Sequence, residues 1–263
     1  MSELILQISN VVKSLGEEML PHFANVEPRI KADGSWITSA DQFAHETLIN
    51  ELPKIVNLPV LSEELSAAQQ QEIITGSSAG YWCVDPLDGT SNFTQGISYW
   101  CISIGLVINE TIKLGVVYDP NRKELFSALD DEPSCLNGQP IVNKPTAELN
   151  QATAILDLKR IPSLLATPII NDNAIRSHRC FGASALDLCW IAADRCQLYL
   201  HGQQKLWDYI AAQKIILNSG GCIESFDGTA VFQNTLSDQT ILASTSETLM
   251  MQWRNYIKTI RTE

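Results

Sequence analysis

Two aspartates three positions apart follow an apolar segment in the first half of the chain. The run reads Trp82-Cys83-Val84-Asp85-Pro86-Leu87-Asp88-Gly89-Thr90. Pro86 fixes one φ angle, and Gly89 allows a left-handed or close-approach geometry. Such a turn can direct Asp85, Asp88 and the Leu87 carbonyl at one point. Taken alone, however, the run is more typical of an acidic surface turn.

Further acidic residues lie at the edges of predicted elements. Glu63 and Glu64 end a short apolar strand, while Asp41 and Asp208 open predicted helices. Each has an ordinary explanation, a solvated loop for the glutamates and a favourable charge at a helix N-terminus for the aspartates. Because these groups contain carboxylates without a zinc-like set of cysteines or paired histidines, they fit a hard cation such as Mg²⁺ better than zinc or iron.

The composition limits the classes of partner. The chain has 263 residues, with 30 acidic against 18 basic side chains and a net charge of −12. This balance argues against nucleic acid and anionic membranes as partners, because both would be repelled. An anionic substrate stays possible, since a bound divalent cation reverses the charge locally. With 45% apolar and 18% charged residues, the chain is predicted to be globular rather than disordered.

The cysteines and the N-terminus indicate the compartment. Seven cysteines without a CxxC motif or a zinc-like pairing predict reduced thiols and a cytoplasmic protein. The N-terminal segment carries Glu3 and no basic region, and its apolar residues recur at helical spacing, which predicts an amphipathic helix rather than a signal peptide. No window approaches about 18 continuous apolar residues, so we expect a soluble protein.

Periodicity and turn residues predict the elements that position these side chains. In the first half, a second helix is expected after Thr38 or Ser39 and through Leu52. Short strands are expected at residues 58–61, 81–84, 100–108, 113–118 and 124–128. Because their connections are too short for crossover helices, we expect an antiparallel sheet.

The second half alternates between the two kinds of element. Strands are expected at residues 152–156, 174–178, 197–200, 222–226 and 240–243. Helices are expected at 183–193, 207–219 and 247–260. The pattern predicts an α+β or layered α/β fold. We expect one domain of two packed halves, about 1–145 and about 146–263, with a soft boundary near 140–150.

Taken together, the acidic motifs resemble those of the inositol monophosphatase-like family of Mg²⁺-dependent, lithium-sensitive phosphatases. The family signatures are E-E, D-P-[IL]-D-[GS]-T and W-D-x₁₁-G-G. The matching residues are Glu63-Glu64, Asp85-Pro86-Leu87-Asp88-Gly89-Thr90, and Trp207-Asp208 followed after eleven residues by Gly220-Gly221. Upstream, the similar segments are Lys31-Ala32-Asp33-Gly34-Ser35 and Ile37-Thr38-Ser39-Ala40-Asp41. The resemblance spans about residues 30–225 and implies an α+β fold, a layered α-β-α-β-α sandwich of the inositol monophosphatase and fructose bisphosphatase type.

The resemblance implies a set of metal ligands. Glu63, Asp85 and the Leu87 carbonyl would hold one Mg²⁺. Asp85, Asp88 and Asp208 would hold a second one. Two such ions stabilise both the attacking and the leaving oxygen of an in-line displacement at phosphorus.

The resemblance also implies how water and phosphate are handled. Glu63, with Asp41, would orient a further, weaker metal or the water. Thr90, paired with Glu63 or Asp41, would activate the attacking water. The backbone N–H groups of Gly89 and Thr90, at a helix start, would receive phosphate oxygens, and Asp88 would also face the substrate.

The residues on the substrate side follow from the same resemblance. Gly182-Ala183-Ser184-Ala185 is similar to the family's G-[ST]-A-A stretch, which assigns Ala183 and Ser184 to the substrate. Seven positions before Asp208 the family usually has a glutamate that contacts inositol hydroxyls, and this chain has His201. His201 is therefore a candidate substrate contact, and a surface histidine at a strand end is the equally good ordinary explanation.

The expected function is the Mg²⁺-dependent hydrolysis of a small-molecule phosphate ester of the inositol 1-phosphate type. The family implies a homodimer. A 3′(2′),5′-bisphosphate nucleotidase is the alternative within the class, followed by histidinol phosphate and sugar bisphosphate phosphatases. A regulatory or interaction protein on a phosphatase fold is the alternative from another class. The full set of metal carboxylates favours an enzyme, because a pure binding module would be expected to lose them.

Overall fold

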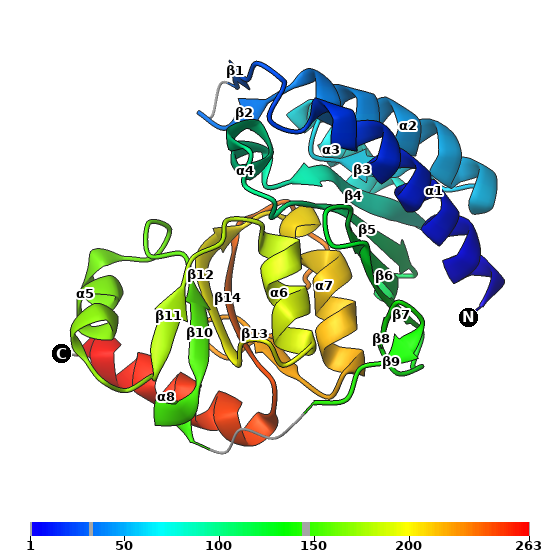
Figure 1. Cartoon of the computed structure of the whole chain (residues 1–263). Coiled ribbons are helices and arrows are strands. Elements are labelled where there is room, and N and C mark those ends of the chain that lie inside the picture. Colours follow the sequence, from blue (N-terminus) through cyan, green and yellow to red (C-terminus); the bar gives the residue numbers. More distant parts are fainter. Residues whose placement is uncertain (1, 32–33, 144–147, 263) are drawn as a thin grey trace.

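Two β-sheets organise the chain, one built from each half of the sequence (Figure 1). The structure is a computed structural model that describes residues 2–31, 34–143 and 148–262. The seven-stranded sheet contains, in spatial order, β3 (Val60–Ser62), β4 (Gly80–Asp88), β5 (Cys101–Ile108), β6 (Thr111–Asp119), β7 (Glu124–Leu129), β8 (Cys135–Leu136) and β9 (Gln139–Pro140). The five-stranded sheet contains β11 (Ser177–Arg179), β10 (Thr153–Leu156), β12 (Leu198–Gln204), β14 (Gln239–Ser244) and β13 (Cys222–Glu224). Two further strands, β1 (Arg29–Ile30) and β2 (Trp36–Ile37), pair with each other.

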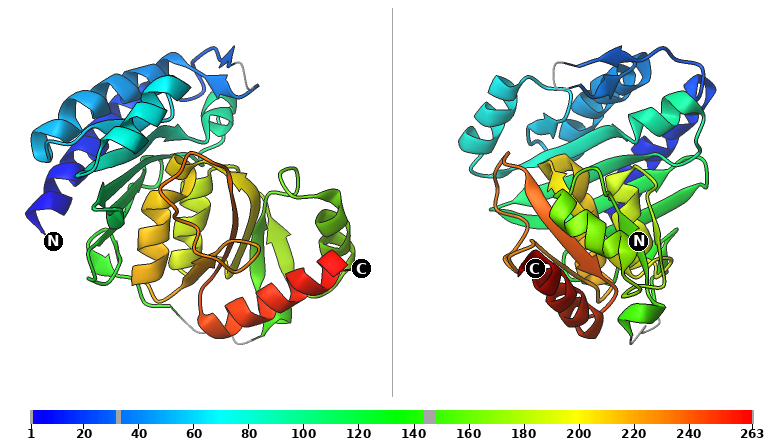
Figure 2. Two further views of the ribbon diagram at one scale, coloured as in Figure 1. Left: turned by 180° about the vertical axis from the view of Figure 1, so that it is seen from behind. Right: turned by 90° about the vertical axis from the view of Figure 1, so that its left-hand side faces the viewer.

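Helices cover the outer faces of both sheets and fill the space between them. They are α1 (Glu3–Met19), α2 (Ser39–Ile55), α3 (Ala67–Gly76), α4 (Thr90–Gln95), α5 (Ser163–Asn171), α6 (Ser184–Ala192), α7 (Leu206–Asn218) and α8 (Glu247–Thr262). Helices α1 and α2 lie on the seven-stranded sheet, α6 and α7 between the sheets, and α5 and α8 on the outer face of the five-stranded sheet (Figures 1 and 2). This order of layers confirms the α+β fold and the α-β-α-β-α sandwich.

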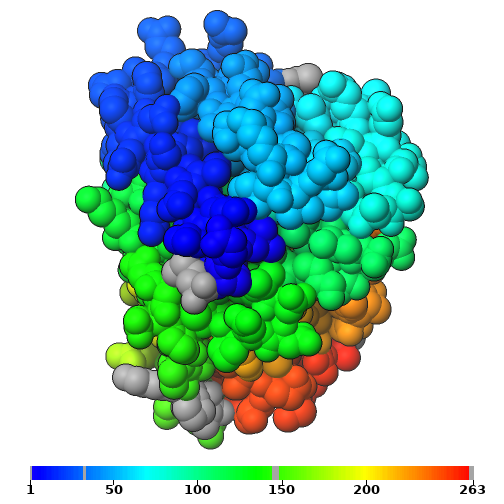
Figure 3. Space-filling view, turned by 90° about the vertical axis from the view of Figure 1, so that its right-hand side faces the viewer, coloured from blue at the N-terminus to red at the C-terminus, as the bar shows by residue number. Residues whose placement is uncertain are grey.

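The strand period of two sorts the side chains of β4 into two cores. Trp82 and Val84 pack with α1 and α2, whereas Tyr81 and Cys83 point to the core that contains α6 and α7. All nine residues of β4 are buried, because helices cover both faces of this sheet. In the space-filling view the N-terminal residues, in blue, lie directly on the green central segment (Figure 3).

Two glycines let α7 approach the seven-stranded sheet closely. Gly105 and Gly115 are partners across β5 and β6. A Cβ on Gly115 would lie 2.0 Å from the carbonyl oxygen of Ala211, and one on Gly105 would lie 2.8 Å from a methyl group of Ile210. The absence of side chains at these two positions therefore seats α7, whose first turn carries Asp208, on the inner face of the sheet.

Most predicted elements are confirmed, and one pairing is wrong. The amphipathic N-terminal helix is α1, and the antiparallel order holds from β4 to β9. Strands β3 and β4, however, are parallel, because the unpredicted helix α3 connects them. A capping box of Ser66 and Gln69 at the start of α3 was the available signal. Helix α5 was also missed.

Three observations bear on the other expectations. The seven cysteines, all within the described ranges, are free thiols. No helix in the described part of the chain is long and apolar enough to cross a membrane. The predicted boundary near residues 140–150 includes residues 144–147, which lie outside the described residues.

Candidate active site

The carboxyl end of β4 carries the central aspartates. The register between β4 and β5 shifts between Asp85 and Asp88, so the strand is irregular where the two acids lie. Gly89 follows with a φ of 95°, the left-handed conformation expected for this turn, and caps α4. Asp85 and Asp88 are only 3% and 8% exposed, so the alternative of an acidic surface turn is wrong.

Asp85, Asp88 and Asp208 each accept a hydrogen bond from a backbone N–H group. Asp85 Oδ1 accepts a hydrogen bond of 3.0 Å from the N–H of Leu87, within its own turn. Asp88 Oδ2 accepts one of 2.7 Å from the N–H of Ala185, in the first turn of α6. Asp208 Oδ2 accepts one of 2.8 Å from the N–H of the residue that caps α7. The hydrogen bond of Asp88 joins β4 to α6, whereas those of Asp85 and Asp208 orient each acid within its own element.

Burial and mutual repulsion disfavour the negative charges of this cluster. Burial raises the pKa of Asp85 well above its usual value, and the charges of Glu63, Asp88 and Asp208 add to the effect. Burial also raises the pKa of Asp88 to about 7, although backbone N–H groups of α6 partly oppose it. The pKa of Asp208 is raised by burial and then by Glu63 and Asp88. The four carboxylates form one electrostatic unit, and among the described residues no cation pairs with Asp85 or Asp88 at its centre.

The donor set fits a hard divalent cation. Carboxylate and carbonyl oxygens are the ligands that Mg²⁺ prefers. The nearby Cys83 and Cys101 do not compete as thiolates, because burial raises the pKa of both thiols well above the usual value. Within the described ranges, no group of three or more acidic, histidine or cysteine side chains already converges in a ligand geometry. The fit therefore rests on the chemistry and charge of the cluster.

Lys31 compensates the glutamate pair at one side of the cluster. Its Nζ lies 2.7 Å from Glu63 Oε1 and 2.8 Å from Glu64 Oε1. Burial lowers the pKa of Lys31, but the two glutamates outweigh burial and raise it. The sequence motif contained Lys31 without assigning it a role, and the next two residues of that motif, Ala32 and Asp33, lie outside the described residues.

Asp41 combines a helix cap with a contact in the site. Its Oδ2 accepts hydrogen bonds from the backbone N–H and the hydroxyl of Thr38, at 2.7 and 2.6 Å, which closes a capping box at the start of α2. Its Oδ1 accepts a hydrogen bond of 2.8 Å from the Thr90 hydroxyl. That hydroxyl also lies 3.1 Å from the Leu87 carbonyl oxygen. Of the two partners expected for Thr90, the structure places Asp41 in contact with it.

The substrate-side residues follow parallel strands. Strands β11, β10 and β12 run parallel, so their carboxyl ends meet at one edge of the sheet. Ala183 and Ser184 stand after β11, at the start of α6, and Asp208 stands after β12. A Cβ on Gly89 would lie 3.1 Å from the Cβ of Ala183, which places these two predicted residues against each other.

His201 lies inside the fold and contacts a second acid. It is 5% exposed, so the interpretation as a surface histidine is wrong. Its Nδ1 accepts a hydrogen bond of 3.2 Å from the N–H of Gln203, and its Nε2 lies 3.3 Å from Asp157 Oδ2. Because Nδ1 is an acceptor, the proton is on Nε2 and is donated to Asp157. Burial opposes the charge of Asp157, but this contact, together with the backbone N–H and the charge of Arg160, outweighs burial and lowers the pKa of Asp157.

A match to a family model shows to which family of proteins this chain belongs. The model of the inositol monophosphatase family matches residues 2–262 of this chain. The chain belongs to the inositol monophosphatase family. It is 34% identical over 202 residues to inositol monophosphatase 1 of Solanum lycopersicum, covering 71% of each chain. It is 29% identical over 210 residues to Nus factor SuhB of Pasteurella multocida, covering 78% of this chain and 77% of the relative.

A solved structure shows the same fold. The extragenic suppressor protein suhB of Bartonella henselae superposes with a TM-score of 0.86, at 24% identity, over 98% of this chain and 99% of that one. The family and the fold are those of a phosphatase. The sequence analysis did not single out Asp157, which contacts the predicted site residue His201. The available signal was the charged run Asp157-Leu158-Lys159-Arg160, directly after the predicted strand at 152–156.

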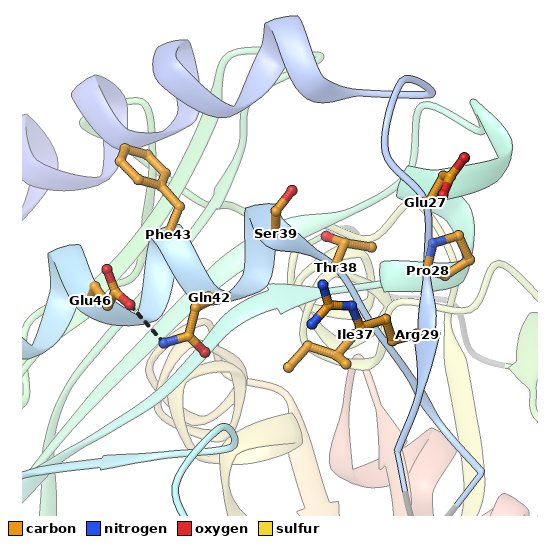
Figure 4. A pocket seen from close by; sticks show the side chains of 9 residues that line it. All are labelled: Glu27, Pro28, Arg29, Ile37, Thr38, Ser39, Gln42, Phe43 and Glu46. Carbon is orange, nitrogen blue, oxygen red and sulfur yellow. Dashed lines mark hydrogen bonds between the residues drawn. The ribbon is translucent and has the colours of Figure 1, made fainter.

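A separate pocket of about 580 Å³ lies beside the start of α2 (Figure 4). Its lining residues are Glu27, Pro28, Arg29, Ile37, Thr38, Ser39, Gln42, Phe43 and Glu46. Thr38 also donates hydrogen bonds to Asp41, which belongs to the upstream inositol monophosphatase motif, so the pocket lies next to that motif. None of these lining residues is a predicted metal ligand, and the carboxylate cluster is therefore the candidate active site.

Proposed function

We propose that this chain hydrolyses a small-molecule phosphate monoester with Mg²⁺, and that inositol 1-phosphate is a representative substrate. The observation that supports this most is the carboxylate cluster, in which the buried Asp85 and Asp88 lie with the half-buried Glu63 and Asp208, and in which Asp85 and Asp88 have no cationic partner among the described residues. A chain with a net charge of −12 can bind a phosphate dianion next to these acids only if cations are present.

The four carboxylates and the Leu87 carbonyl would hold the ions. Bound Mg²⁺ supplies Lewis-acid stabilisation of the attacking and leaving oxygens. Thr90 donates its proton to Asp41, which leaves lone pairs of Thr90 Oγ1 free to accept a hydrogen from the attacking water. The N–H groups of Gly89 and Thr90 lack helical partners at the start of α4 and would bind phosphate oxygens.

The test is hydrolysis of inositol 1-phosphate with Mg²⁺ by the wild type and by Asp85→Asn. The substitution removes a charge that both ions would share, and we expect kcat/KM to fall about 100-fold or more. Asp130→Asn is the matched control, since Asp130 is an exposed residue outside the cluster with a φ of 44°, which asparagine tolerates. Full activity of Asp85→Asn, or of enzyme freed of metal by a chelator, would contradict the proposal.

The similarity to Nus factor SuhB favours a regulatory role as a second candidate function. Such a role would persist in Asp85→Asn, because it needs the surface of the fold and not the chemistry of the cluster. We also propose a homodimer, to be tested by sedimentation, and a cytoplasmic location, which the seven free cysteines support.

A further inference from the structure

The segment from Asp157 to Arg160 enters the site beside α7. It follows β10, which runs parallel to β12, and α7 with Asp208 follows β12. The N–H of Asp157 donates a hydrogen bond of 3.2 Å to the Leu200 carbonyl, one residue before His201. In sheets of this kind, ligands bind outside the carboxyl ends of the parallel strands. The segment therefore lies at the edge where Asp208, a predicted metal ligand, and the start of α6 also meet.

Contacts with β12 fix the backbone of this segment. A Cβ on Gly202 would lie 1.9 Å from the carbonyl oxygen of Arg160, so glycine is required for the close approach. Asp157 Oδ1 accepts hydrogen bonds from the N–H groups of Lys159 and Arg160, at 3.1 and 3.2 Å, while Oδ2 faces His201. Asp157 and His201 thus act as positioning residues for Arg160.

The side chain of Arg160 is an exposed cation next to an acidic site. It forms no salt bridge or side-chain hydrogen bond with another residue in the part of the chain that the structure describes. Burial raises the pKa of Asp208, and the charge of Arg160 is near enough to oppose that rise. Its planar guanidinium can bind a phosphate or a carboxylate with two parallel hydrogen bonds.

We propose that Arg160 determines specificity by binding a second anionic group, a phosphate or a carboxylate, on the leaving alcohol of the phosphate ester. This inference rests on the proposed function and refines its substrate class. The carboxylate cluster, through the Mg²⁺ that it would hold, would bind the phosphate that is cleaved. Arg160, on the side of Asp208, is placed to bind an anionic group carried by the leaving alcohol.

Matched pairs of esters test the proposal with the full-length, Mg²⁺-loaded enzyme. Adenosine 3′,5′-bisphosphate against adenosine 3′-monophosphate tests a second phosphate, and 2-phosphoglycerate against glycerol 2-phosphate tests a carboxylate. The measured quantity is the ratio of kcat/KM between the ester with the second anion and its partner. In Arg160→Gln we expect this ratio to fall about 10- to 100-fold, mainly through KM, for at least one pair. Arg160→Lys should restore part of it.

Arg176→Gln is the matched control. Arg176 is also exposed but precedes β11, at the opposite end of the same parallel strands, and its substitution should leave both ratios unchanged. Unchanged ratios in Arg160→Gln, or an equal fall in Arg176→Gln, would overturn the inference while ester hydrolysis stands. If the wild type hydrolyses none of the four esters and no inositol 1-phosphate, the proposed function itself fails.

Discussion

The carboxylate cluster should make the metal-free protein less stable as the pH rises, and Mg²⁺ should reverse this. Asp88 has a pKa of about 7 in the folded chain against an ordinary value of 3.8. Between these values the folded state keeps a proton that the unfolded state has released. Stability therefore falls with increasing pH in this window, and the loss is complete above pH 7.

The size of the effect follows from the same two values. A pKa of about 7 in place of 3.8 corresponds to about 4 kcal/mol of unfolding free energy. The pKa values of Asp85 and Asp208 are raised by burial in the same direction. Because a small protein is stabilised by only about 5–15 kcal/mol, such a change is readily measured. Bound Mg²⁺ favours the ionised acids, so its stabilisation should be larger at pH 8 than at pH 5.

The assay is urea unfolding followed by tryptophan fluorescence, between about pH 5 and 8, after dialysis against a chelator and again with Mg²⁺. Asp88→Asn removes one titrating group and should flatten the pH dependence in the metal-free state. Asp130→Asn replaces an exposed carboxylate outside the cluster and should leave the pH dependence unchanged. A metal-free stability that is constant or rises over this range, or equal stabilisation by Mg²⁺ at both ends, would refute the reasoning.

Four further predictions concern single contacts and an ion. Thr90→Val should lower kcat about 100-fold or more with little change in KM, and Thr90→Ser should retain activity, as steady-state kinetics would show. Lithium, near Mg²⁺ in size but with half its charge, should inhibit uncompetitively with respect to substrate; no inhibition at high lithium would count against the assigned metal ligands. His201→Glu should lower the free energy of unfolding by about 1–3 kcal/mol in chemical denaturation, since a buried glutamate there would face the Asp157 carboxylate. Gly115→Ala should cost about 3 kcal/mol through its clash with α7, while Gly76→Ala, with open space around it, should be neutral or slightly stabilising in the same assay.

The local geometry of the site could be predicted because short sequence segments determine it. The left-handed conformation of Gly89 and the position of Asp41 in a helix cap both follow from neighbouring residues. The three motifs then indicated which acids belong together. The metal-ligand and substrate roles of these residues stay predictions until metal binding and kinetics are measured.

Contacts between distant segments could not be predicted from the same patterns. Lys31 and Glu63 are 32 residues apart, and no local pattern indicates that they pair. Asp157 and His201 meet because β10 and β12 are neighbours, which requires the strand order of the sheet. The parallel pairing of β3 and β4 was missed for a related reason, since it depends on the unpredicted α3.

The distribution of charge around the cluster connects the two proposals. Lys31 compensates Glu63 and Glu64 at one side, and Arg160 is the cation on the side of Asp208. Between them, Asp85 and Asp88 accept only backbone or thiol hydrogen bonds from the residues that the structure describes, and burial raises the pKa of both. A cation is therefore needed most at the centre, where the end of β4 presents both acids. A substrate phosphate drawn to cations held there would lie between Thr90 and the start of α6. A leaving group on the side of Asp208 would then lie near Arg160, and we expect its charge to determine which substrates this site selects.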